Sequence, residues 1–420
     1  MATRQQTLFT LMLVALAMAT STFTVLRFGE LAIGVPELIL LGCIIAHVPL
    51  GGNLHAGGNS RRFMIGLALL YVAMLPGFFM TLVSQGLLED VMHNLLALTW
   101  IVVLFAYLQF GFEYGRDELE WLCGLVLAFS GLYFAICLGL AAFVPETVYM
   151  TEEFVELDVG GAANAADLVP RQRLHGFAAN PNQFGLHAIV ALFFCLCFWS
   201  RVGSVKSIVL MGVILAAGFL TGSDAFILGA VLMIGATVVL GLLLSGNIYK
   251  LLILFVPLII GSIVVYRPVM RQVRELAQAN DQDQTRFILW ENGWRAVLES
   301  PVFGWGPGSW SGHNGPLELF ESHNSVIDYL ANSGLVGGFL MAACLLGFGF
   351  AVLRSGRATF MAGMAGILFF AMFHNTLRQP LMWLAFFYIA HHVWEDRPAP
   401  AARSSRRRRQ RRSSRSRAVA

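Results

Sequence analysis

The sequence contains few charged residues. Of its 420 residues, 13% are charged and 57% are hydrophobic, whereas a soluble globular domain carries about 25% charged residues. Apolar runs of about 20 residues, the length needed to cross the hydrocarbon core of a bilayer, recur along the chain. The composition therefore excludes a soluble protein and predicts an all-α integral membrane protein.

Lysine is almost absent. The chain has 2 lysines and 26 arginines, and nine of the arginines lie between Arg403 and Arg417. The net charge of +3 thus describes one terminal segment, and the remaining chain is net acidic. Residues 397–420 lack apolar periodicity, so we expect a disordered cytoplasmic tail. We interpret it as a segment that fixes topology, with contact to anionic lipid head groups as the alternative, and we expect no nucleic-acid partner.

The chain also lacks a cysteine pattern and an internal repeat. All six cysteines fall inside apolar runs, and none has the spacing of a metal ligand, so we interpret them as small apolar side chains. We expect no metal and no cofactor. Many secondary transporters are built from two related halves, and the absence of a repeat disfavours that class.

Twelve apolar runs predict about twelve transmembrane helices. They are residues 8–26, 32–50, 63–83, 95–111, 120–144, 183–200, 207–221, 225–245, 251–266, 335–353, 359–377 and 380–395. Arginine and lysine gather in every second connection, which predicts that both termini are cytoplasmic. The connections 145–182 and 267–334 then lie on the periplasmic face of a bacterial inner membrane.

This pattern divides the chain into four parts. Residues 1–266 should form the first nine spans, with a periplasmic loop at 145–182. Residues 267–334 should form a large helical periplasmic loop, and residues 335–396 the last three spans. Residues 397–420 form the tail.

The first outer loop ends in LVPRQRLHGFAANPNQFG, residues 168–185. Arg171 and Arg173 stand shortly before an Asn-Pro turn, and Asn182 is a candidate cap for the following helix. An arginine held near a membrane surface can bind a phosphate group through its planar fork. The alternative is that both arginines only contact lipid head groups.

The large loop predicts a helix that begins near Asp283 or Thr285 and ends near Ser300. Its apolar residues recur at steps of three and four, which is typical of a helix at a membrane interface or packed on the bundle. Arg286 stands in its first turn, where a helix already favours an anion. Trp290 should lie one turn further, beside Arg286.

A glycine-rich segment and a histidine follow. The backbone amides of residues 304–308, GWGPG, are weak candidates for an anion site. His323 and Asn324 precede a second helix that should end at Gly334. The positive end of a helix disfavours a protonated imidazole, so His323 should be neutral and able to accept a proton from a hydroxyl. The alternative is a histidine that only makes a hydrogen bond in the loop.

The two motifs together resemble the O-antigen ligase and polymerase superfamily. The resemblance rests on TRFILWENGWRAVLESPVFGWGPGSW at 285–310 and ESHNSVIDYLANSGLVGG at 321–338. The segment RLHGFAANPNQFG at 173–185 is also similar to the family's sequence before a central span.

The resemblance implies a membrane glycosyltransferase of the GT-C type. Such enzymes take a glycan from undecaprenyl diphosphate on the periplasmic face and transfer it, without a metal and with inversion, to an acceptor hydroxyl. The family's diphosphate-binding arginines correspond to Arg173 and Arg286, and its catalytic histidine to His323. Supporting positions are Arg171, Trp290 and Asn324. The chain departs from the family at Asp224, which follows Ser223 where the family often has arginine.

Several functions remain open at this stage. We favour a ligase with lipid A core as acceptor, whereas a polysaccharide polymerase or a protein O-glycosyltransferase would use the same motifs. A transporter or flippase without catalysis is the alternative of another class, with His187, Asp224 and His374 along its path. An enzyme should bring the two arginines and His323 to one cavity, and a transporter has no need to.

Overall fold

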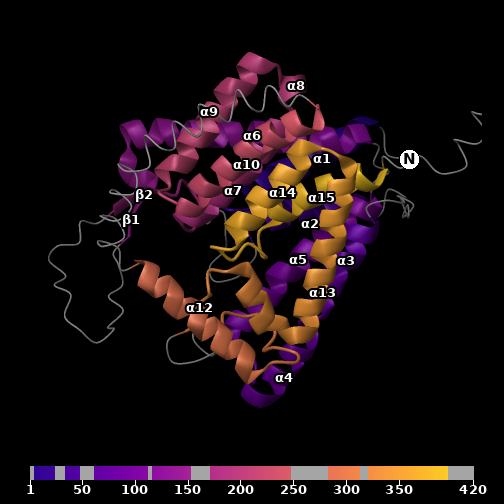
Figure 1. Cartoon of the computed structure of the whole chain (residues 1–420), viewed down its shortest axis with the longest axis vertical. Coiled ribbons are helices and arrows are strands. Elements are labelled where there is room, and N and C mark those ends of the chain that lie inside the picture. The colour runs from indigo at the N-terminus through magenta and orange to yellow at the C-terminus, as the bar shows by residue number, and fades with distance from the viewer. Residues whose placement is uncertain are drawn as a thin grey trace, which may run out of the picture.

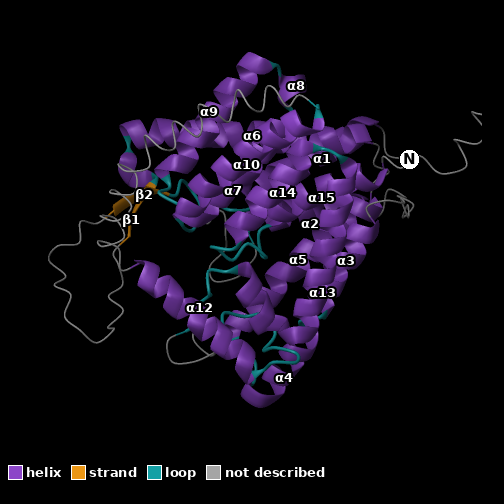
Figure 2. Cartoon of the chain, in the orientation of Figure 1, coloured by secondary structure: helices purple, strands orange, loops and turns teal. Residues whose placement is uncertain are grey.

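The computed structural model describes residues 4–23, 34–47, 61–111, 116–152, 171–246, 282–312 and 320–395. Most of this part of the chain is helical (Figures 1 and 2). The helices are α1 (Arg4–Thr20), α2 (Val35–His47), α3 (Arg61–Val72), α4 (Leu75–Gln85), α5 (Glu89–Gly111), α6 (Arg116–Phe143), α7 (Pro181–Cys197), α8 (Trp199–Val202), α9 (Ser204–Leu220), α10 (Asp224–Leu244), α12 (Gln282–Glu299), α13 (Ser325–Ser355), α14 (Ala358–Ala371) and α15 (Pro380–Glu395).

Five helical stretches are long and apolar enough to cross a membrane. They are Arg61–Gln85, Glu89–Gln109, Asp117–Phe143, Asp224–Leu244 and Ser325–Ser355. The predicted class, a largely helical membrane protein, is confirmed, whereas the number of twelve spans stays a prediction. The ninth predicted span, 251–266, and the tail at 397–420 lie outside the described residues.

The helices form two groups (Figure 1). In the first group α6, α7, α9, α10 and α14 pack into a bundle. The close contact of α10 with α14 depends on small residues, since a side-chain carbon on Gly229 would lie 3.3 Å from the carbonyl oxygen of Gly366. In the second group α3, α5 and α13 run together toward α4, where α12 packs against α13. Small residues let membrane helices approach closely.

The start of α7 corrects one expectation. Asn180, and not Asn182, caps this helix: its backbone is extended, and its side-chain oxygen accepts the Gln183 amide at 2.9 Å. Pro181 then occupies the first turn, where a missing amide hydrogen costs nothing. The Asn-Pro pair therefore forms the cap itself, and the side chain of Asn182 is available for another contact.

The loop before α7 contains a short antiparallel ribbon that the sequence did not predict. Strand β1 (Tyr149–Glu152) pairs with β2 (Arg171–Leu174), and Met150 lies opposite Arg173. The amides of His175 and Gly176 extend the pairing by donating to the Val148 carbonyl, at 3.0 and 3.1 Å. The ribbon gives Arg173 a fixed backbone.

Helix α13 is broken at Gly334, whose φ of 62° and ψ of −163° are not helical. The first helical part thus ends at Gly334 as predicted, but a second part resumes at once. The turn at 301–306 fills the break. The backbone amides of residues 335 and 336 donate to the carbonyls of residues 301 and 302 in the turn, at 2.7 and 3.2 Å. The amides of residues 305 and 306 in the turn donate to the carbonyls of residues 331 and 332, at 2.8 and 3.0 Å. The turn therefore satisfies the backbone groups that the break leaves without helical partners.

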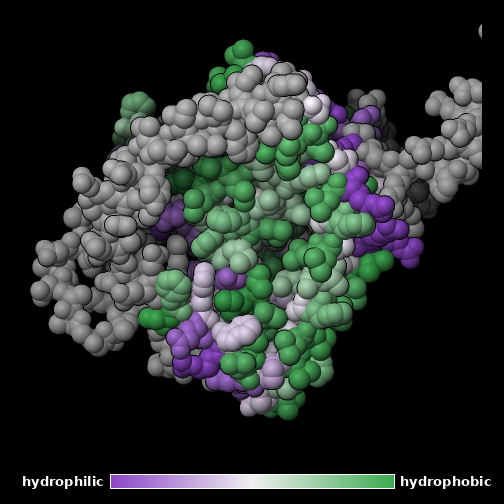
Figure 3. All heavy atoms as spheres, in the orientation of Figure 1, coloured by the Kyte–Doolittle hydropathy of each residue, from purple (hydrophilic) through white to green (hydrophobic). Residues whose placement is uncertain are grey.

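Helix α12 has apolar residues on two sides. Leu289, Ala296 and Val297 are buried, and the last two belong to a cluster with Trp310 and Ala331. Phe287 and Leu298 on the other side are 65% and 64% exposed. Figure 3 shows polar side chains gathered around this helix and apolar ones over much of the remaining visible helical surface. The helix thus packs on the bundle and exposes a second apolar side, whose contact with a membrane interface stays a prediction.

Candidate functional site

His323 stands in a strained turn directly before α13. Its φ of 54° makes it the single non-glycine residue with positive φ among the residues described. Asn324 caps α13, because its side-chain oxygen accepts the amides two and three residues later, at 3.0 and 3.2 Å. On the other side the Ser322 amide donates to Asp328 Oδ1 at 2.8 Å. Such backbone strain costs about 1–3 kcal/mol and is concentrated at functional sites.

The loop between α14 and α15, residues 372–379, lies beside this turn and is called the wall below. The rings of His323 and His374 meet edge to face, with centroids 6.1 Å apart and planes at 72°. The Ser325 hydroxyl donates to the His374 carbonyl at 2.7 Å and accepts the Thr376 amide at 2.9 Å. The His323 turn and the His374 loop are therefore joined through one side chain.

An ion pair joins the same two segments a second time. Glu321 and Arg378 are in contact, and their side chains are 19% and 32% exposed. Glu321 lies two residues before His323, and Arg378 lies four residues after His374. The two segments are thus fixed to each other on both sides of the histidine pair.

Helix α12 reaches this wall through Trp290. The Trp290 ring lies 6.3 Å from the ring of Phe373, the neighbour of His374. Arg286 stands one helical turn before Trp290, a step of about 6 Å along the surface of a helix. The helix begins at Gln282, so Arg286 is its fifth residue and lies one turn later than predicted. The side chain of Arg286 lies outside the described residues.

Arg173 is buried on β2, with 6% of its surface exposed. Its Nε donates to the Thr221 carbonyl at 2.7 Å, and its Nη2 donates to Asn182 Oδ1 at 2.9 Å. The guanidinium thus connects the ribbon to the start of α7 and the end of α9. The side chain of the neighbouring Arg171 lies outside the described residues.

Phe370 connects the surroundings of Arg173 to the histidine pair. A side-chain carbon on Gly185, three residues after Asn182, would lie 3.5 Å from the Phe370 ring and 3.6 Å from Ser223 Cβ. The Phe370 ring in turn lies 4.9 Å from His374. The end of α14 therefore contacts the environment of Arg173, the His323 turn and, through Phe373, the helix that carries Arg286.

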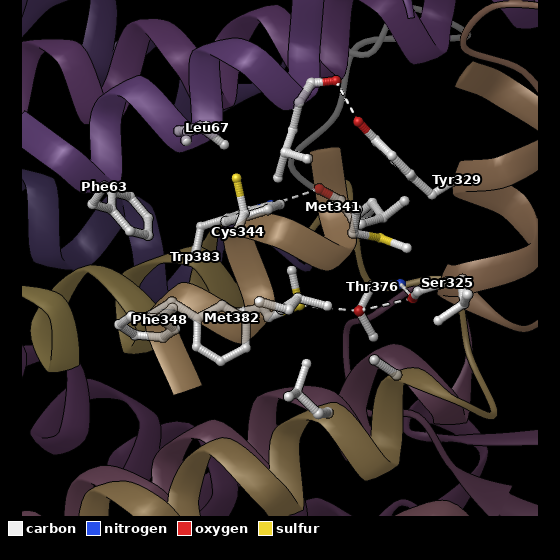
Figure 4. A pocket seen from close by; sticks show the side chains of 18 of the residues that line it. Phe63, Leu67, Ser325, Tyr329, Met341, Cys344, Phe348, Thr376, Met382 and Trp383 are labelled. Carbon is white, nitrogen blue, oxygen red and sulfur yellow. Dashed lines mark hydrogen bonds between the residues drawn. The ribbon is translucent and has the colours of Figure 1, made fainter. Parts of the chain in front are cut away.

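A large apolar cavity begins at the same place. Its volume is about 600 Å³, and its lining comes mainly from α3, α5, α13, α14 and α15. Figure 4 shows Ser325 and Thr376 together at one end and Phe63 and Phe348 at the other. Ser325 is two residues from His323, and Thr376 is two residues from His374. Neither histidine lines the cavity itself, but each is two residues from a side chain that lines this end; Arg62, next to Phe63, is also a lining residue.

The glycine-rich segment is not the anion site that we considered. The amides of Trp305 and Gly306 donate to the carbonyls of Ala331 and Asn332, and a side-chain carbon on Gly306 would lie 2.5 Å from Phe78. Its glycines are required for close packing against α4 and α13. The segment therefore has a structural role, because it holds the start of α13, which follows the His323 turn, against α4.

The three residues considered for a transport path have different surroundings. His187 is buried in the first bundle, 2.8 Å from the Ser130 hydroxyl and stacked on Tyr133. Asp224 is exposed at the start of α10, one residue after the capping Ser223. His374 belongs to the wall beside His323. The described residues thus place these three side chains in three different surroundings.

The comparison with known proteins agrees with the motif resemblance. A family model described as O-antigen ligase matches residues 188–342. No curated protein matches the chain. The matched range contains Arg286, Trp290, His323 and Asn324 but neither Arg173 nor His374. Together with the apolar helices, the match indicates a bacterial membrane protein.

Proposed function

Because this chain belongs, through residues 188–342, to the O-antigen ligase and polymerase superfamily, we propose that it is a lipid-linked glycan transferase. It takes a glycan from undecaprenyl diphosphate and transfers it to an acceptor hydroxyl on lipid A core. The reaction takes place on the periplasmic side of the bacterial inner membrane, with inversion and without a metal.

The observation that carries the proposal is that His323 stands two residues before Ser325, which lines one end of a largely apolar cavity. A polyprenyl donor has an apolar tail and a charged diphosphate head, so it needs an apolar chamber that opens beside polar groups. The cavity of about 600 Å³ offers room for part of such a tail, and binding sites of this kind commonly measure roughly 300–1,000 Å³. A soluble sugar nucleotide would have no use for this chamber.

The proposed chemistry is a single displacement. The acceptor oxygen attacks the anomeric carbon, and the bond to the diphosphate oxygen breaks with its electron pair on that oxygen. His323 takes the acceptor proton as the new bond forms. Arg286 and Arg173 stabilise the negative charge on the leaving diphosphate, and donors fixed in advance stabilise it most effectively. The two hydrogen bonds that hold the Arg173 guanidinium in place support this role.

The test is glycan transfer by the purified full-length protein. An undecaprenyl-diphosphate glycan is supplied with lipid A core in one reaction and with a second lipid-linked repeat in another. We expect product on lipid A core, and loss of at least about 100-fold in His323→Ala, because a general base contributes roughly 10²–10⁴-fold. A lengthened lipid-linked chain would instead identify a polymerase.

A matched pair of arginines on α12 tests the diphosphate role. Arg286→Ala should abolish transfer, whereas Arg295→Ala should not, since Arg295 is 60% exposed and pairs with Glu291 at 3.1 Å. EDTA is included because Asp281 and Asp283 form an Asp-x-Asp pair near the start of α12. Loss of transfer in EDTA would refute metal independence. Full activity in both His323→Ala and Arg286→Ala would refute the site.

A further inference from the structure

His374 occupies the centre of the wall described above and has no role in the proposed reaction. It lies outside residues 188–342, and no motif in the sequence marks it. Its side chain is 5% exposed, between the rings of Phe370 at 4.9 Å and His323 at 6.1 Å. A polar ring enclosed in this way and directed at a candidate general base requires an explanation.

We propose that His374 is a positioning residue that holds the His323 imidazole in the orientation needed to take the acceptor proton. The proposal rests on the proposed function, because it assigns His323 the role of base. His374 itself takes no proton from the substrate in this account. It acts through the ring contact with His323.

The backbone and the ring of His323 are held by different contacts. A residue with φ of 54° is held by its neighbours, and here Asn324 and Ser322 are fixed by hydrogen bonds. Those contacts fix the backbone and do not themselves set the two side-chain torsions of His323. The edge-to-face contact with His374 restricts rotation about these torsions, since aromatic rings prefer this geometry.

The attachment of the His374 loop makes the support rigid. The Ser325 hydroxyl binds the His374 carbonyl and the Thr376 amide, so the loop and the first residue of α13 move as one unit. The ring of Phe370 also contacts His374, with centroids 4.9 Å apart. The distance between the two histidine rings is thus set by α13 and α14 together, and not by loop conformation alone.

The experiment measures kcat and KM separately for His374→Ala and His374→Phe in the transfer assay. We expect His374→Ala to lower kcat about 10–100-fold, in line with the cost of misplacing a catalytic group by about 1 Å. The KM for the lipid-linked donor should change less than about threefold, because His374 does not bind it in this account. His374→Phe keeps a ring at the same place and should restore kcat to within about fivefold of the wild type.

A second histidine pair supplies the control. His391 and His392 also meet edge to face, with centroids 6.0 Å apart and planes at 70°. His391 is equally buried, at 4% exposure. His391→Ala should leave kcat unchanged, which separates a role at the site from a general need for buried histidine pairs.

The double variant separates failure of this inference from failure of the proposed function. In the His323→Ala background, adding His374→Ala should cause no further loss, because residues that act as one unit are not additive. Activity retained in His323→Ala would refute the proposed base. If His323→Ala is inactive, two results would overturn the inference. One is a wild-type kcat for His374→Ala. The other is a folded His374→Phe variant whose kcat is as low as that of His374→Ala. Should His374→Ala not fold, His374→Phe decides alone.

Discussion

Replacing Gly334 by alanine tests the account of the broken helix α13. The backbone of Gly334, with φ of 62° and ψ of −163°, lies in a region open essentially to glycine alone, and another residue there costs about 1–3 kcal/mol. An added side-chain carbon would also lie 2.6 Å from the Phe303 amide nitrogen and closer still to the Val302 carbonyl. Overpacking of this kind costs about 1–3 kcal/mol more. We therefore expect Gly334→Ala to destabilise the protein by about 2–6 kcal/mol.

The assay is thermal unfolding of the purified protein in detergent. By the usual relation between stability and melting temperature, Gly334→Ala should lower Tm by on the order of 10 °C. Gly347→Ala is the matched control on the same helix: its added carbon meets nothing within 4 Å, and alanine is favoured over glycine in a helix by about 1 kcal/mol. Equal Tm values for the two variants would refute the assignment of the 301–306 turn as the element that requires glycine at 334.

Three further predictions concern the contacts around the site. Arg173→Lys keeps the charge, but an ammonium group cannot reproduce the planar guanidinium that binds the oxygens of Thr221 and Asn182, so transfer should fall at least about tenfold in a folded protein. Full activity would exclude the proposed role of Arg173 in binding the diphosphate. Glu321→Gln and Arg378→Gln should show a coupling of about 1 kcal/mol in a double-mutant cycle of unfolding, whereas additive effects would mean that the ion pair does not join the two segments. Asp90→Asn weakens the charged acceptor of the Ser309 amide, 2.6 Å away, and should cost about 1–2 kcal/mol; an unchanged Tm would contradict this.

The nature of the local elements could be predicted from the sequence. Apolar runs of sufficient length predicted helices, and most helices of the described residues overlap those runs, although the run 63–83 is divided between α3 and α4. Helix α12 lies outside the runs and was predicted from its periodicity. Asn324 and Gly334 indicated where the first part of α13 begins and ends, because capping depends on residues within a few positions. The motif around Arg286 and His323 indicated the family for a similar reason: its two halves, 285–310 and 321–338, are continuous segments of 26 and 18 residues.

Features that depend on distant segments were missed. The ribbon of β1 and β2 joins segments about 20 residues apart, and neither has the alternation of a strand. The amides of residues 305 and 306 were considered for an anion, yet the broken helix α13 uses them. Asn182 was assigned to a cap, but it accepts a hydrogen bond from Arg173.

The sequence by itself thus determined the class of protein, the helices and the two motifs, because hydrophobic length, capping and local spacing act over one segment at a time. Only the tertiary structure decided which groups share a site. His374 is 51 residues from His323, and the Phe370 ring belongs to a different helix from either candidate arginine. Their contacts arise from the packing of α14 against α10 and α13, and packing depends on the shapes of surfaces that no single segment contains.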